Sequence, residues 1–158
     1  ALPAAIGIRE TRHIEALHRL TGEELLRGEA FPDAIANGTY PVDIHIASPD
    51  RESYDHFLKD FTSLRLKRGE SYGIPYRTLT PRGLANVLVA GRCISTDRNL
   101  QASVRVMPGC YITGQAAGVA AALAAAADAD SRRVPVGLLQ ERLAAMGAYL
   151  PNFARPAK

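Results

Sequence analysis

The fold of this chain is decided by three consecutive blocks, Asn86-Val-Leu-Val-Ala-Gly-Arg-Cys-Ile-Ser95, Arg105-Val-Met-Pro-Gly-Cys110 and Gly114-Gln-Ala-Ala-Gly118. The apolar, β-rich run 87–90 predicts a strand buried on both faces, and Gly91 ends it. A second strand-like run covers 102–107 and leads into Pro108, a residue that is tolerated in the first turn of a helix. From there we expect a helix to about Ala127.

The predicted helix has small residues on every side. Its first turn would present free backbone N–H groups and a partial positive charge, which suits an anionic or electron-rich ligand. Gly114 and Gly118 lie four residues apart on one face, which predicts close packing of this helix on a strand. Strand-like runs followed by helices indicate an α/β fold, or an α+β mixture within this chain.

The first half of the chain contains several weaker signals. Thr21 and Glu24 have the capping-box spacing, so a short helix should begin there and end near Gly28. The segment 33–37 predicts another helical turn, closed by Asn37-Gly38. The segment 48–67 predicts an irregular or partly helical surface region, and 71–77 a strand and turn.

Beyond the third block, apolar residues repeat at helical spacing from Val136 to Met146. This pattern predicts an amphipathic terminal helix, with Gly147 as its C-terminal cap. Ala5 to Leu20 mixes β-branched and charged residues and predicts a strand.

The run from Tyr40 to His45 predicts a strand with one apolar and one polar face. Asp43 and His45 are two residues apart and therefore share the polar face. A carboxylate beside an imidazole can orient it as a general base, whereas the simpler alternative is a polar pair that hydrogen-bonds a loop. The residues leave both alternatives open.

Composition excludes several classes of function. The 158 residues suffice for one domain with a real core, and 22 % charged residues with a net charge of +3 are ordinary for a globular protein. No basic block with interleaved aromatic residues predicts nucleic-acid binding, and no uninterrupted run of about 18 strongly apolar residues predicts a membrane span. Cys93 and Cys110 fit no metal or redox spacing, so we expect two buried thiols, with a disulfide as the alternative, and no metal site.

The chain resembles the FAD-dependent oxidoreductases of the two-dinucleotide-binding, glutathione-reductase-like type. The resemblance rests on six blocks in the family's order, Gly7-Ile-Arg-Glu-Thr-Arg12, Tyr40-Pro-Val-Asp-Ile-His45, Ile74-Pro-Tyr-Arg77, Leu88-Val-Ala-Gly-Arg-Cys-Ile-Ser95, Ser103-Val-Arg-Val-Met-Pro108 and Gly114-Gln-Ala-Ala-Gly-Val-Ala-Ala-Ala-Leu123. They span nearly the whole chain.

This resemblance implies FAD as cofactor and hydride transfer from a small organic substrate, with sugar-related compounds as one suggested class. It implies catalytic roles for Arg9, Asp43 and His45. It implies flavin contacts by two groups of residues, Gly91 with Arg92 and Arg105 with the start of the long helix. The cofactor-binding residues expected in all are Gly91, Arg92, Arg105, Met107, Pro108, Gly109, Gly114 and Gln115.

The family's G-x-G-x-x-G motif for the FAD pyrophosphate does not occur in these residues. We therefore expect a C-terminal portion of a longer flavoprotein, which an upstream FAD-binding segment completes. In that organisation 1–80 belong to a substrate domain, 81–150 to the Rossmann-like FAD-binding domain, and 151–158 to a loose tail. No signal peptide is visible, so a cytoplasmic location is the expectation.

Two other functions stay open at the level of sequence. The chain could be a catalytically inactive folded fragment that acts as a binding or structural domain without flavin. It could also be a small anion-binding domain that uses the N-terminus of the same helix. Retention of flavin, or binding of phosphate without flavin, would separate these alternatives.

Overall fold

The structure, a computed structural model, describes residues 12–44, 50–151 and 153. Its helices and strands follow in the order α1 (Gly22–Leu26), β1 (Ala34–Gly38), α2 (Arg51–Ser63), β2 (Tyr72–Pro75), α3 (Arg98–Val104), α4 (Met107–Ala126) and α5 (Val136–Ala145). Three short 3-10 turns lie between them: η1 (Tyr76–Thr78), η2 (Gly91–Cys93) and η3 (Ser131–Arg133). The mixed α/β content is as expected, although the sheet of the described residues has two strands.

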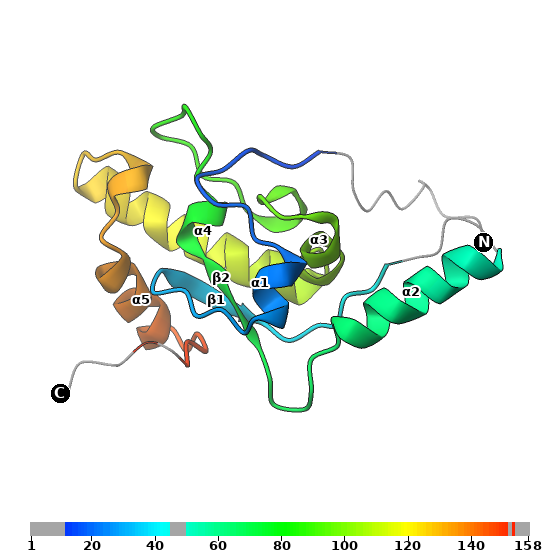
Figure 1. The fold of residues 1–158 in the computed structure, drawn as a ribbon. Coiled ribbons are helices and arrows are strands. Elements are labelled where there is room, and N and C mark those ends of the chain that lie inside the picture. Colours follow the sequence, from blue (N-terminus) through cyan, green and yellow to red (C-terminus); the bar gives the residue numbers. More distant parts are fainter. Residues whose placement is uncertain (1–11, 45–49, 152, 154–158) are drawn as a thin grey trace, which may run out of the picture.

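β1 and β2 form an antiparallel pair that crosses in front of α4 (Figure 1). Ala34 lies opposite Pro75 and Ala36 opposite Ile74, with an irregularity in β1 between the two pairs. α4 packs on β1 and α5, whereas α2, which separates β1 from β2 in the chain, projects away from this two-stranded sheet. The long helix α4 and the two-stranded sheet therefore face each other across the core.

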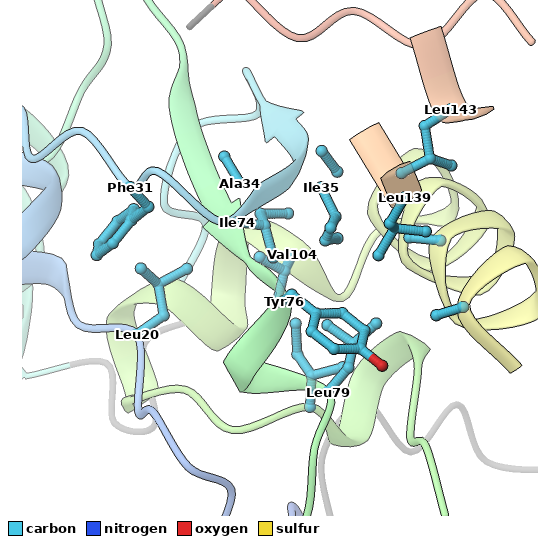
Figure 2. Close-up of a cluster of buried hydrophobic side chains, with 14 of the residues drawn as sticks. Leu20, Phe31, Ala34, Ile35, Ile74, Tyr76, Leu79, Val104, Leu139 and Leu143 are labelled. Carbon is cyan, nitrogen blue, oxygen red and sulfur yellow. The ribbon is translucent and has the colours of Figure 1, made fainter. Parts of the chain in front are cut away.

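The main hydrophobic core lies between the two-stranded sheet, α4 and α5 (Figure 2). The side chains of Leu20, Ile74, Leu79 and Leu139 are almost completely buried there. Burying each such side chain contributes about 1.5–3 kcal/mol. Because Leu20 and Ile74 join Leu139 in one cluster, segments from both ends of the chain share this core.

The capping box of α1 is confirmed. The Thr21 N–H donates to Glu24 Oε2 at 2.8 Å, and the Glu24 N–H donates to Thr21 Oγ1 at 3.3 Å. Two backbone donors at the start of the helix are thereby satisfied. The predicted strand and turn at 71–77, the long helix and the terminal helix are confirmed as β2 with η1, α4 and α5.

The segment 14–20 holds the fold together, although it is not a regular strand. Its backbone forms hydrogen bonds with two other segments. Leu17 N donates to Thr80 O at 3.0 Å, and Leu20 N donates to Ser95 O at 3.1 Å. Isolated bridges at Ala16 and Leu20 mark the same two neighbours. The segment therefore lies between 77–82 and 93–97. The strand expected from Ala5 to Leu20 is not formed in its described part, 12–20, which has only the two isolated bridges.

The strand expected at 87–90 is not formed. Val87 is 39 % exposed, and the run 87–90 has no strand assignment. Val89 N donates to Leu79 O at 2.9 Å, but no described strand pairs with this run. The prediction was wrong for this structure because an apolar run becomes a strand only where another strand supplies the hydrogen-bond ladder.

The strand expected at 102–107 is also wrong, since most of it is helical. Asp97 caps α3 by accepting a hydrogen bond from Leu100 N at 2.8 Å. Leu100 and Val104, four residues apart, are both buried, so a helix satisfies the same apolar residues. The run is too short for its β-branched residues to outweigh this cap.

The helical turn expected at 33–37 is the strand β1 instead. Gly38 ends this strand rather than a helix. A Cβ at Gly38 would lie 2.3 Å from Cζ of Tyr72, so the bare glycine lets the tyrosine ring cover the backbone. The strand expected at 40–45 is not formed in its described part, 40–44.

The close-packing face expected for the long helix is wrong as well. Gly114 and Gly118 are exposed, and a Cβ on either would meet nothing within 4 Å. The inner face of α4 is formed by Ala116, Ala120 and Ala124. An almost uniformly apolar helix does not reveal from its own sequence which face packs inward.

Candidate active site

The candidate site lies at the corner between α3 and α4. Arg105 ends α3, and Val106 begins α4 without any side-chain cap. Because Pro108 has no N–H, the amide donors of this first turn are those of Met107 and Gly109. An uncapped N-terminus of a 20-residue helix presents donors and partial positive charge to a ligand.

Gly109 permits the tight corner. A Cβ there would lie 2.1 Å from the backbone oxygen of Val104, too close for any side chain. The glycine is therefore required by the α3–α4 junction itself. Its predicted role near a cofactor remains a prediction.

The turn η2 packs against the first turns of α4. Gly91 has a φ of +81°, a conformation that favours glycine. Its N–H donates to Thr113 Oγ1 at 3.0 Å, and that hydroxyl donates to Gly109 O at 2.7 Å. Arg92 follows on the exposed side of the turn. The structure thus brings Gly91 and Arg92 close to the start of α4.

Arg105 joins this corner to the segment that contains Asp43. Arg105 Nη2 donates to the backbone oxygen of Asp43 at 2.6 Å, across 62 positions of sequence. His45 and Arg9, the other two residues expected to be catalytic, lie outside the described residues. Of the catalytic candidates, Asp43 is therefore the one whose place next to Arg105 is described.

A buried pair of hydroxyls supports the same segment. Ser103 Oγ lies 2.6 Å from both Tyr40 O and the Tyr72 hydroxyl. Because a carbonyl oxygen only accepts, Ser103 donates to Tyr40 and must accept from Tyr72. Burial raises the pKa of Tyr72 to about 12. This relay was not visible in the sequence because its members are distant in the chain.

Two exposed apolar side chains lie at the site, the predicted Met107 and also Tyr111, which the sequence reasoning missed. Met107 and Tyr111 are 67 % and 70 % exposed, and they lie four residues apart on α4. Residues at this spacing share one face of a helix. Gly114 is on the exposed side one turn further along, and Gln115 is half-buried. The spacing of apolar residues around a uniformly apolar helix gave no signal for this exposed face.

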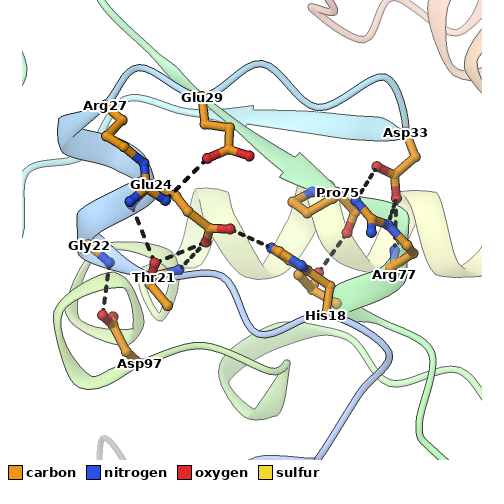
Figure 3. A network of polar contacts seen from close by, with 11 residues as sticks. His18, Thr21, Gly22, Glu24, Arg27, Glu29, Asp33, Pro75, Arg77 and Asp97 are labelled. Atoms are coloured by element: carbon orange, nitrogen blue, oxygen red, sulfur yellow. Dashed lines mark hydrogen bonds and ion pairs between the residues drawn. The ribbon is translucent and has the colours of Figure 1, made fainter.

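A second polar network has a structural role (Figure 3). Arg77, which resembles a family motif residue, donates to Asp33 Oδ2 at 2.9 Å and to Oδ1 at 3.2 Å. His18 Nε2 lies 3.1 Å from Glu24 Oε1. These pairs connect the two-stranded sheet and α1 to neighbouring segments. Both carboxylate oxygens of Asp33 accept hydrogen bonds from Arg77.

The residues at the α3–α4 corner fit a flavin. The N1 and C2 carbonyl positions of a flavin accept hydrogen bonds and gain negative charge on reduction, and uncapped N–H donors with a positive helix end complement them. The exposed side chains of Met107 and Tyr111 complement the apolar part of the ring. Arg92 and Arg105 add guanidinium groups of the kind that pair with phosphate.

No group of three or more His, Cys, Asp or Glu side chains in the described part of the chain could hold a metal ion. Both Cys93 and Cys110 are free thiols. α4 has the length and mean hydropathy, 1.3, of a membrane-spanning helix, but a core helix of a globular protein passes the same test.

Comparison with known proteins gives one result. Searches of curated proteins and of solved structures found no match to this chain. The sequence profile of the family described as "FAD dependent oxidoreductase" matches residues 1–143. This range includes the Asp43 segment, η2, the α3–α4 corner and all of α4. The chain therefore belongs to the FAD dependent oxidoreductase family, and FAD is its cofactor.

Proposed function

We propose that this chain is the C-terminal portion of a glutathione-reductase-like flavoprotein that transfers hydride between a small organic substrate and FAD. Sugar-related compounds are one candidate class of substrate. Within it, 81–150 would complete the Rossmann-like FAD-binding domain and 1–80 would contribute to the substrate domain. The tail 151–158 would have no part in the site.

One observation supports this proposal above the others. The hydrogen bond from Arg105 Nη2 to Asp43 O ties the segment with the catalytic candidate to the uncapped start of α4. A substrate held by that segment would lie beside a ring held by the helix. Such proximity is what hydride transfer between two bound molecules requires.

FAD supplies the hydride acceptor when it is bound. The residues of this chain would then have three tasks. The amides of Met107 and Gly109 would bind the electron-rich edge of the ring. Asp43 would orient His45, and His45 would take the proton that a substrate hydroxyl or C–H loses. Arg92 would pair with a phosphate of the cofactor.

The proposed partner is an upstream FAD-binding segment of the parent protein. Val87 is exposed although it belongs to an apolar β-rich run, and the outer face of α4 is apolar and exposed further along at Ala121 and Ala125. Both surfaces are suited to burial against a parallel sheet, whose strands are covered on both faces. The same exposure supports a second candidate function, a folded fragment without activity that binds its partner through these surfaces.

Flavin retention tests the proposal. The purified chain is mixed with FAD, desalted, and compared with Arg105→Gln by its flavin absorbance bands. A band in the unaltered chain that falls by at least about half in Arg105→Gln supports a flavin site at this corner. Arg68→Gln is the matched control, since Arg68 is exposed and lies outside the α3–α4 corner. A band in Arg105→Gln equal to that of the unaltered chain would place the flavin elsewhere. No band in any sample would mean that these residues complete a site whose other half lies upstream, and that this chain alone is a folded piece of it.

A further inference from the structure

A separate cavity of about 320 Å³ lies beside the segment 14–20. Its polar lining side chains are His13, Glu15, Arg19, Arg82 and Ser95. None of them belongs to the α3–α4 corner, and none has been given a role above. The balance of formal charge is positive, with two guanidinium groups against one carboxylate.

Both arginines are held by the backbone. Arg82 Nε donates to Ala16 O at 2.9 Å, and Arg19 Nε donates to Thr96 O at 3.3 Å. The Nη groups of Arg19 and Arg82 have no partner among the described residues. Each guanidinium is thus fixed through one nitrogen while its other donors are available.

Backbone hydrogen bonds join the segments that line the cavity. Ile14 N donates to Cys93 O at 3.0 Å, and Arg82 N donates to Glu15 O at 2.9 Å. Ser95 is almost completely buried, and its N–H donates to Thr78 O at 3.2 Å. Three segments distant in sequence are therefore joined under the two arginines, which fixes the spacing of the donors before any ligand binds.

We infer that this cavity binds a phosphate group. Two guanidinium forks offer more donors than the two oxygens of a single carboxylate can accept, whereas a phosphate has enough oxygens for both. The serine hydroxyl adds a donor at the cavity wall. Glu15 opposes an anion, so it limits the affinity of the site. This inference does not depend on the flavin proposal.

Inorganic phosphate is the probe, and amide resonances of the full chain in a ¹H–¹⁵N spectrum are the readout. We expect saturable shifts at Ala16, Ser95 and Thr96, which surround the two arginines. Arg19→Gln and Arg82→Gln should each weaken binding about threefold or more. Arg68→Gln removes the same charge elsewhere and should leave the affinity unchanged.

Glu15→Gln gives the opposite sign, because it removes the one opposing charge and should tighten binding about twofold or more. Chloride at equal ionic strength should not reproduce the shifts. If chloride does so, or if the arginine variants bind phosphate normally, the inference is overturned. Acetate that binds as tightly as phosphate would overturn the assignment to phosphate.

FAD also contains phosphate groups, so a third titration identifies the source. Competition between FAD and inorganic phosphate at Ser95 would assign the site to the cofactor's own phosphates. Simultaneous binding would assign it to a separate phosphate-bearing ligand. Either result supports a phosphate site. If the chain does not bind FAD, the flavin proposal fails, but the shifts caused by inorganic phosphate should still be seen.

Discussion

Removal of the Ser103 hydroxyl tests whether the segment before Asp43 is held from within the core. In Ser103→Ala, the Tyr72 hydroxyl loses its acceptor and Tyr40 O loses its donor, both previously at 2.6 Å. Tyr72 is buried, so water cannot replace the lost partner. The substitution therefore leaves a buried donor unsatisfied.

The magnitude follows from these contacts. An unsatisfied buried hydroxyl costs about 1–3 kcal/mol, and a lost intramolecular hydrogen bond adds about 0.5–1.5 kcal/mol. We expect Ser103→Ala to lower the free energy of unfolding by about 2–4 kcal/mol. Tyr72→Phe should cost only about 0.5–1.5 kcal/mol, since Ser103 can still donate to Tyr40.

Urea denaturation of the full chain measures these differences. The double variant Ser103→Ala with Tyr72→Phe should be no less stable than Ser103→Ala alone, because it removes the unsatisfied donor. Thr39→Ala is the control, since Thr39 is exposed and outside the relay. Equal costs for the two single variants, or simple addition in the double variant, would refute the direction assigned to the relay.

Three further predictions concern the loop, the core and alkaline pH. Gly91→Ala should lower the free energy of unfolding by about 1–2 kcal/mol, because a φ of +81° strains any residue with a Cβ; an unchanged melting temperature would contradict this. Leu139→Ala should cost about 2–5 kcal/mol in chemical denaturation, whereas Leu138→Ala, at an exposed position of the same helix, should cost far less; similar losses would mean that the assigned inner face of α5 is wrong. Burial raises the pKa of Tyr76, like that of Tyr72, from 10.0 to about 12. The unfolded chain therefore loses these protons first, and stability that is complete below pH 10 should decline by about 2–3 kcal/mol per tyrosine as the pH rises to about 12; Tyr76→Phe should flatten this decline, and a variant with the unchanged slope would argue against the shift.

The helices could be predicted where their signals are local. Thr21 and Glu24 define α1 within four residues, and Pro108 with the alanine-rich run defines α4. Helical hydrogen bonds form within the segment itself, so sequence near the helix is sufficient. The part of the candidate site formed by the N-terminus of α4 was predictable for the same reason.

The strands and the long-range contacts could not be predicted in this way. The run 87–90 has the composition of a strand, but its pairing depends on a neighbour that the run does not specify. The contact of Arg105 with Asp43 spans 62 positions, and that of Arg77 with Asp33 spans 44. Which residues meet in these long-range contacts depends on the packing of the two-stranded sheet on α4, and no local sequence pattern encodes that packing.

A map of FAD on the chain tests the central proposal most directly. Amide resonances of the isotopically labelled full chain are followed as FAD is added. Saturable shifts at Gly91, Gly109 and Cys110, with α5 unchanged at Leu143, are the result we expect from a ring at the start of α4. Shifts confined to α5 or to the two-stranded sheet, with the start of α4 unaffected, would contradict the proposed flavin site.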